Sequence, residues 1–412
     1  MRIGDRIVRD AFWHGDRCNW VGAQPRGSEH AAHRVNVTYR SLGPELYSGT
    51  SGASLFLAEL YRVTGDSAVR KTALGAIRHA LSRVDSISPL VRIGLFSGWT
   101  GVALAAARVA ILLDDVDLFN RATDLAARAT TQPCDRKEFD MISGRAGAIV
   151  ALVVLAALLG QPGFLEAAAR LGRELVDSAT RDRDTCSWEL SGIKSYRNLT
   201  GFSHGAAGAA VALLELHSET GEALFRDAAL RAFQYERHHF SAHQGNWPDF
   251  RKNTVTSGRK PSSFPCLSFW CHGAPGIALA RLRACQLLGE ECFKTEAGIA
   301  LATTRDSIVA AHTSSSGNYS LCHGLAGNCE AILYGACVFD DRTADPSIVF
   351  DTALAAIERY GVSGASWPCG THFGETPGLM LGLSGIGHHL LRLSDLSIPS
   401  VALLNKFQWR IM

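Results

Sequence analysis

Two kinds of apolar pattern alternate along the chain. Seven stretches are apolar almost all round, for example residues 102–113 and 148–159. The segments between them, such as residues 67–84 and 162–180, carry charges on one face and apolar residues at i, i+3, i+4 and i+7. A helix that is apolar all round must be buried, whereas a helix with one polar face lies at a surface. The alternation predicts an all-α fold, an α/α toroid with seven inner and seven outer helices. An open solenoid is the alternative, but it would expose one flank of the inner helices.

A short glycine signature opens each of the apolar stretches. It recurs every 46 to 68 residues, a period that suits two helices with their connections. Its copies are YSGTSG at 47–52, FSGWTG at 96–101, ISGRAG at 142–147, SHGAAG at 203–208, CHGAPG at 271–276, CHGLAG at 322–327 and a variant, LSGIG, at 383–387. Glycine removes the Cβ atom where a chain turns sharply and neighbours approach closely. The signatures also leave the N–H groups of the inner helices pointing into the mouth of the ring.

Length and composition fit one large ring. The 412 residues are 47% hydrophobic and 19% charged, which excludes a disordered chain or a coiled coil. We expect a single unit over residues 1–412, with residues 1–40 as a helical lead-in to the ring. A net charge of +2 gives no basic excess, so a nucleic-acid partner is not expected. The longest uncharged apolar run, residues 148–159, is too short to span a bilayer, and the N-terminus lacks the apolar region of a signal peptide. These features predict a cytoplasmic protein, in which the 11 cysteines stay reduced.

Candidate chemistry gathers in three consecutive signatures. If all seven turns converge on one end of the ring, the residues just before each glycine face one another. Three successive turns replace Ser with His, and two of these add Cys, which brings together Cys271, Cys322, His204, His272 and His323. Cys and His together in a reducing compartment are typical zinc ligands. Four protein ligands, Cys271, His272, Cys322 and His323, would make a closed structural site, whereas three ligands with an open position would make a catalytic one.

The signatures resemble those of the lanthionine synthetase cyclase (LanC-like) family. The resemblance rests on YSGTSG, GFSHGAAG, WCHGAPGI and LCHGLAGN, together with ETPGLMLGLSGIG and the ending PSVALL, and it covers essentially the whole chain. It is closest to the C-terminal cyclase half of the bifunctional LanM type. The family implies an α/α toroid that holds Zn²⁺ and adds Cys thiols of a ribosomal peptide to dehydroalanine or dehydrobutyrine, making thioether rings.

The resemblance also implies roles for individual residues. Carried over position by position, the zinc ligands are Cys271, Cys322 and His323. His204 corresponds to the acid/base histidine, which would protonate the α-carbon after thiol addition, and Asp140 to a family aspartate that orients this histidine or stabilises its charged form. An aspartate in this position also caps helices readily, so Asp140 has a structural alternative.

Two positions depart from the family pattern or are left open by it. The family does not use the position of His272 as a ligand, so we assign His272 to the pocket wall. Some members carry an Arg four residues before the first zinc Cys, where this chain has Leu267. Either another cation replaces it, with Arg251, Lys252, Arg259 and Lys260 lying upstream, or the enolate is stabilised differently.

Partners and rival functions follow from what else the chain contains. It has no P-loop or kinase signature, so we expect a dehydrated precursor peptide to be supplied by a separate dehydratase. One rival function is zinc-dependent addition of glutathione or another small thiol to dehydroamino acids, and another is a non-catalytic, zinc-stabilised scaffold for a modified peptide. An (α/α) glycosidase is disfavoured, because no paired carboxylates recur at the turns.

Overall fold

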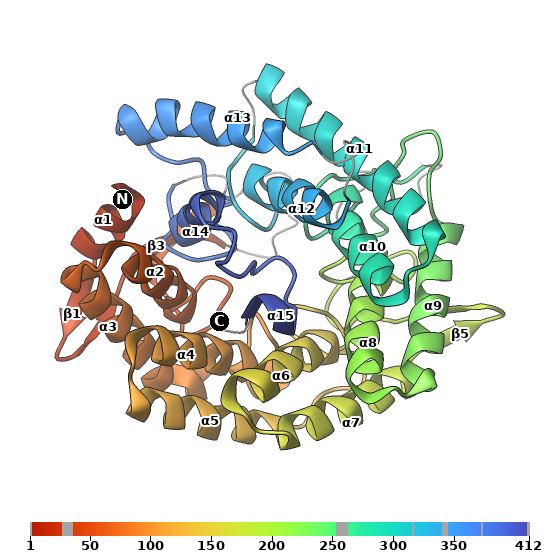
Figure 1. The fold of residues 1–412 in the computed structure, drawn as a ribbon, viewed down its shortest axis with the longest axis horizontal. Helices are drawn as coiled ribbons and strands as arrows, with labels where there is room; N and C mark the ends of the chain where they lie inside the picture. The colour runs from red at the N-terminus through yellow and green to blue at the C-terminus, as the bar shows by residue number, and fades with distance from the viewer. Residues whose placement is uncertain are drawn as a thin grey trace.

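The helices form two concentric rings (Figure 1). The computed structural model describes residues 2–26, 36–252, 263–314, 317–339, 345–371 and 374–409. Within these residues the inner ring consists of seven helices: α2 (Thr50–Thr64), α4 (Trp99–Leu113), α6 (Arg145–Leu159), α8 (Ala206–Thr220), α10 (Ala274–Leu288), α12 (Leu325–Val338) and α14 (Leu383–Ser394). The outer ring, in the same part of the chain, consists of α3 (Ser67–Arg83), α5 (Val116–Thr130), α7 (Gly163–Asp177), α9 (Ala223–His238), α11 (Glu291–Ser314), α13 (Ser347–Ala356) and the N-terminal α1 (Arg2–Arg9).

Contacts between neighbouring inner helices close the ring. Each inner helix packs against the next, and α14 packs against α2, so the toroid is confirmed and the open solenoid is excluded. The predicted division of roles also holds, since α4 and α6 are buried nearly all round and α5 and α7 have exposed polar faces. In the part of the chain that the structure describes, no outer helix follows α14, and α1 packs on α14 at that place in the outer ring (Figure 1). None of the helices in the described residues combines the length and apolar character needed to cross a membrane.

The N-terminal segment differs from the expected helical lead-in. Among the described residues of this segment only α1 is helical, and it is followed by two antiparallel strand pairs, β1 (Phe12–His14) with β2 (Arg17–Asn19), and β3 (Val21–Arg26) with β4 (Asn36–Ser41). Between β1 and β2, Gly15 has a φ of 60° in a two-residue Gly-Asp turn, which is a turn chemistry that favours hairpins over helices. Another short hairpin, β5 (Thr180–Asp182) with β6 (Thr185–Ser187), follows α7.

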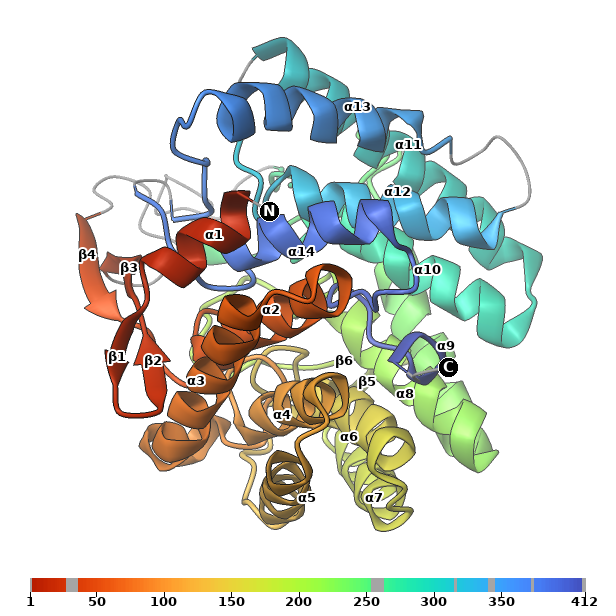
Figure 2. The same cartoon turned by 60° about the vertical axis from the view of Figure 1, so that its left-hand side comes forward.

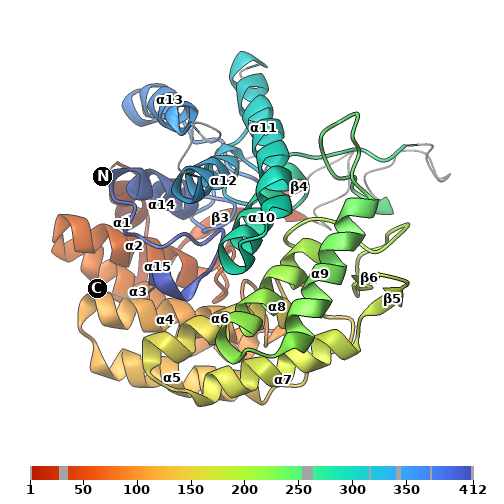
Figure 3. The same ribbon diagram turned by 45° about the vertical axis from the view of Figure 1, so that its right-hand side comes forward.

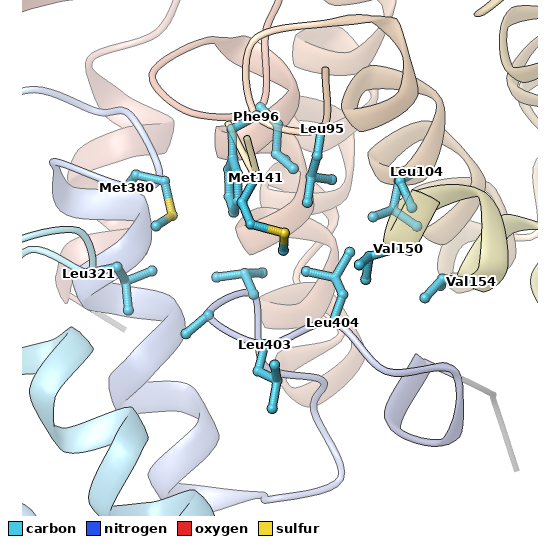
Figure 4. Packing of buried hydrophobic residues seen from close by; sticks show 14 of the residues in the cluster. Leu95, Phe96, Leu104, Met141, Val150, Val154, Leu321, Met380, Leu403 and Leu404 are labelled. Carbon is cyan, nitrogen blue, oxygen red and sulfur yellow. The ribbon is translucent and has the colours of Figure 1, made fainter. Parts of the chain in front are cut away.

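The remaining short elements lie in connections. They are η1 (Val84–Ser86), η2 (Pro89–Val91), a π-helical turn η5 (Ile357–Val362) and the C-terminal α15 (Lys406–Trp409). The β3–β4 hairpin lies at the end of the ring that carries the signature turns, and α15 lies at the opposite end (Figures 2 and 3). The segment before α15 enters the centre of the ring, where Leu403 and Leu404 lie among Met141, Val150 and Leu321 (Figure 4).

A circle of backbone hydrogen bonds joins the signature turns. Each turn donates an N–H to a carbonyl of the next, at 2.8–3.3 Å: Tyr47 to Phe96, Phe96 to Ile142, Met141 to Ser203, Ser203 to Cys271, Cys271 to Cys322, Cys322 to Met380 and Met380 back to Tyr47. Buried backbone groups must be paired, so these turns satisfy one another instead of using water. The turns are therefore fixed side by side, as the sequence predicted.

The circle corrects the register of the seventh signature. Helix α14 starts after Gly382, and Met380 takes the place that Cys322 holds in the preceding turn. The signature is therefore MLGLSG at 380–385, and Gly385, which the sequence pattern LSGIG predicts to be the first glycine of the signature, is the second. The segment contains glycines at 382, 385 and 387, and only the contacts between turns decide which of them begins the helix.

The second glycine of each signature is required by close packing. A Cβ on Gly101 would lie 1.6 Å from the carbonyl oxygen of Leu95 in its own turn and 3.1 Å from the Cβ of Leu46 in the preceding turn. The same double contact recurs around the ring, ending with Gly385, whose added Cβ would lie 1.8 Å from the Leu379 oxygen and 3.0 Å from Leu321. Most of these glycines are thus explained by packing.

Candidate active site

Three soft ligand side chains converge at the turns before α10 and α12. The Sγ atoms of Cys271 and Cys322 and a ring nitrogen of His323 all lie within 4.8 Å of one another, and they form the one such group found among the described residues. The two turns lie side by side because the N–H of Cys271 donates to the carbonyl of Cys322 at 3.3 Å. His272 is not part of the group. The arrangement therefore offers three ligands instead of the closed set of four.

The surroundings of His323 fit a metal-binding role. Its Nε2 lies 2.8 Å from the carbonyl oxygen of Gly370, and a carbonyl can only accept, so Nε2 carries the proton. In the neutral ring Nδ1 then presents a lone pair, and a histidine ligand is typically oriented by such a hydrogen bond from its other nitrogen. Gly370 is itself held by its N–H, which donates to Leu381 at 2.8 Å. Two thiolates and one imidazole with an open position are a donor set that suits catalytic Zn²⁺.

His204 and Asp140 form a pair beside this group. The Nδ1 of His204 hydrogen-bonds Oδ2 of Asp140, which is 3% exposed. The other carboxylate oxygen, Oδ1, accepts the N–H groups of Ser143 at 2.8 Å and Gly144 at 3.0 Å. Asp140 therefore does both things that the sequence left as alternatives: it caps the turn before α6 and it orients His204. Because Nδ1 is engaged, Nε2 is the atom of His204 that can exchange a proton with a substrate.

His272 lies between His204 and a second carboxylate. Its ring centroid is 5.8 Å from that of His204, and the residue is 3% exposed. Burial opposes ionisation of Asp249, but His272 and Arg251 outweigh it and lower the pKa of the Asp249 carboxyl. Arg251 bonds this carboxylate with its Nε, at 3.0 and 2.9 Å from Oδ1 and Oδ2. Arg251 is one of the cations that could replace the family arginine absent at Leu267. It is paired with the Asp249 carboxylate.

The other three upstream cations are Lys252, Arg259 and Lys260. Lys252 is exposed, and its Nζ lies 5.3 Å from the ring centroid of Tyr196. Arg259 and Lys260 lie outside the described residues. Leu267 contributes its backbone, since its carbonyl accepts from the side-chain amide of Asn246 at 3.1 Å.

Residues 40–403 match the sequence model of the lanthionine synthetase C-like protein family. The chain belongs to this family. A curated relative, the lacticin 481/lactococcin biosynthesis protein LcnDR2 of Lactococcus lactis subsp. lactis, is 24% identical over 390 residues, which cover 92% of this chain and 38% of the relative. The chain thus spans less than two fifths of that protein's length. Among solved structures, nisin cyclase superposes with a TM-score of 0.64 at 19% identity, covering 85% of this chain and 89% of the other, which supports the shared fold.

This LanC-like chain also has a carboxyl group near His204 and Asp140, that of Glu138, which the sequence did not single out. Burial raises the pKa of Glu138 to about 7, the neighbouring Asp140 and Asp135 add to the rise, and His204 opposes it. Glu138 is half-buried and lies two residues before Asp140. The only sequence signal was the density of acidic residues ahead of the third signature, a pattern that is equally typical of a solvated loop.

Proposed function

We propose that this chain is a zinc-dependent lanthipeptide cyclase. It would add Cys thiols of a dehydrated ribosomal peptide to dehydroalanine or dehydrobutyrine and so form lanthionine or methyllanthionine rings. The observation that carries the proposal is the convergence of Cys271, Cys322 and His323 beside the His204–Asp140 pair. The family match supports it, as do the two relatives, one a lacticin 481/lactococcin biosynthesis protein and the other a nisin cyclase.

The proposed first step needs a thiolate. A free thiol has a pKa of about 8.5 and is mostly protonated at neutral pH. Cys271, Cys322 and His323 would hold Zn²⁺, which would supply the positive charge that keeps a substrate thiol deprotonated. The sulfur then attacks the β-carbon of the dehydroamino acid, and a C–S bond forms. The electron pair of the C=C bond moves toward the carbonyl oxygen, giving an enolate.

His204 completes the addition by donating a proton to the α-carbon. Its Nε2 is the atom available for this transfer, because Nδ1 is held by Asp140. The carboxylate of Asp140 stabilises the charged imidazolium that must form before the proton is delivered. The thiol loses one proton and the α-carbon gains one, so the reaction is balanced without a further reactant.

Partners follow from the substrate that this reaction needs. The peptide must arrive already dehydrated, so the proposal includes a precursor peptide and a separate dehydratase. The cytoplasmic location stays a prediction from the sequence.

The test uses zinc-loaded protein and a synthetic peptide that contains one dehydroalanine and one Cys. After incubation, free thiols are alkylated and the products are weighed by mass spectrometry. Cyclisation is expected to remove the alkylatable thiol without changing the peptide mass, and His204→Ala is expected to keep zinc but lose this activity. In a second arm with glutathione, a glutathione adduct in place of the ring would favour the small-thiol alternative. No thiol consumption in either arm, with zinc bound, would favour the scaffold.

A further inference from the structure

A fully buried glutamate on the outer ring holds both ends of the turn that carries His204. Glu236 lies near the C-terminal end of α9 and is 0% exposed. One oxygen of its carboxylate, Oε1, accepts the N–H of Gly201 at 3.0 Å and the N–H of Ala207 at 2.9 Å. These two amides lie three residues before and three residues after His204. A single oxygen atom therefore fixes the width of the turn.

The turn has little freedom to move independently of the metal-ligand turn. Gly201 has a φ of 99°, and a Cβ there would lie 3.3 Å from the carbonyl oxygen of Cys271 and from the Cα of His272. The backbone carbonyl of Glu236 also accepts the indole N–H of Trp247 at 3.0 Å. The end of α9 thus anchors the His204 turn against the turn of Cys271.

A buried ion pair with Arg281 is the ordinary explanation for such a glutamate, and the contacts argue against it. Arg281 is fully buried on α10, but its Nε donates to Glu296 of α11. Burial raises the pKa of Glu236 to about 7, and the guanidinium of Arg281 and the two backbone N–H groups only partly oppose this rise. Whether ionised or protonated, Oε1 remains an acceptor for Gly201 and Ala207.

We propose that Glu236 is a positioning residue for the acid/base step: by holding Gly201 and Ala207 it sets the place of the His204 imidazole relative to the zinc ligands. The proposal rests on the proposed function. It implies that loss of the shared oxygen slows proton transfer at His204 while zinc binding by Cys271, Cys322 and His323 is kept.

Two conservative variants separate positioning from charge. Glu236→Gln removes the charge but keeps an oxygen at the same distance from the backbone, whereas Glu236→Asp keeps the charge but withdraws the oxygen by about one C–C bond, or about 1.5 Å. A misplacement of about 1 Å in a catalytic group can reduce rate about 100-fold. We expect kcat for peptide cyclisation to fall ~10- to 100-fold in Glu236→Asp and less than ~5-fold in Glu236→Gln, with wild-type zinc content in both.

Glu215 supplies the matched control. It is 1% exposed on α8, and both of its carboxylate oxygens bond the guanidinium of Arg283, at 2.5 and 3.0 Å. No signature turn is bonded to this carboxylate in the described residues. Here the charge matters, so Glu215→Gln is expected to lower the unfolding temperature more than Glu215→Asp does, and neither should change kcat of the folded protein by more than ~3-fold.

Amide hydrogen exchange at Gly201 and Ala207 gives a second readout that does not need activity. Exchange should remain slow in Glu236→Gln and become at least ~10-fold faster in Glu236→Asp, and adding Glu236→Asp to His204→Ala should cause no further loss of kcat. The reverse order, with Asp active and Gln impaired, or equal exchange in both variants, would overturn the proposal in favour of an ion pair. A wild-type protein that binds zinc but forms no rings would overturn the proposed function instead, and the exchange rates would then decide on Glu236 alone.

Discussion

Asp140→Asn changes one functional atom of the His204–Asp140 pair. In the wild-type protein Oδ1 accepts two backbone N–H groups and Oδ2 accepts the Nδ1 of His204. An asparagine must keep its oxygen toward the two backbone donors, so its NH₂ group is turned toward His204. Nδ1 of His204 then has to accept instead of donate, so the proton of the neutral ring lies on Nε2. The substitution also removes the negative charge that stabilises the imidazolium.

The expected loss of rate can be bounded from these contacts. A hydrogen bond to a charged group contributes about 1.5–3 kcal/mol, so losing it costs about 10- to 150-fold in the population of the charged acid. Complete loss of the acid/base contribution would cost about 10²- to 10⁴-fold. We therefore expect kcat for cyclisation to fall by at least about 10-fold and by no more than about 10⁴-fold. The backbone bonds of Oδ1 are kept, so the free energy of unfolding should change by less than about 1 kcal/mol.

The assay is single-turnover cyclisation of the dehydrated peptide by zinc-saturated protein, followed by thiol alkylation and mass spectrometry. Asp140→Ala serves as the comparison, because it also removes the cap of the turn and should destabilise the protein as well as slow it. Because Asp140 acts through His204, the double variant Asp140→Asn with His204→Ala should be no slower than His204→Ala. An Asp140→Asn rate within about threefold of wild type would refute the assignment of His204 as the acid.

Three further predictions concern the metal, the ring and pH. Cys322→Ser is expected to remove bound zinc, as measured by elemental analysis, and a stoichiometric zinc content in that variant would contradict the ligand set. Glu330→Gln should destabilise the protein by about 3–5 kcal/mol in denaturant unfolding, because the buried Glu330 carboxylate pairs with Arg392 of α14 and its loss leaves that cation uncompensated. Glu236 has a folded-state pKa of about 7 against an ordinary 4.5, so between these pH values the folded protein keeps a proton that the unfolded chain has lost. Its unfolding free energy should therefore fall by up to about 3 kcal/mol from pH 4.5 to 7, and Glu236→Gln, compared at pH 5 and 7, should remove that slope.

The toroid was predictable because two independent patterns agree. The alternation of fully apolar and amphipathic segments gives inner and outer helices, and the glycine signatures mark where each inner helix begins. The seventh signature was misplaced by three residues, because Gly382 and Gly385 each precede a plausible helix and only the hydrogen bond of Cys322 to Met380 distinguishes them. The N-terminal hairpins differ from the expected helical lead-in because local turn chemistry decides this segment: Gly15, with a φ of 60°, favours a two-residue hairpin turn over a helix.

The candidate ligands and His204 were predictable because they occupy equivalent places in repeated turns. Glu236 was missed, since a glutamate near the end of an amphipathic outer helix usually faces solvent. A signal was present: Glu236 continues the buried stripe of α9, at the helical spacing set by Phe225, Ala229 and Phe233. A charged residue on an apolar stripe is a buried charge that needs a partner, and here the partners are backbone amides of the His204 turn.

The candidate metal site depends on closure of the whole ring. Cys322 donates its N–H to Met380, and Met380 donates to Tyr47 of the first turn, so the position of a ligand from the sixth turn is fixed by the contact between the seventh and the first. His323 is oriented by Gly370, which is held in turn by Leu381 of the seventh turn. Zinc that binds only the closed ring must stabilise it by RT ln(1 + [Zn²⁺]/Kd). Substitutions that loosen the contacts of α14 with α2 should therefore weaken zinc affinity, even though they lie far from the ligands. The coupling is reciprocal, so the free energy with which closure strengthens zinc binding equals the free energy with which zinc strengthens closure.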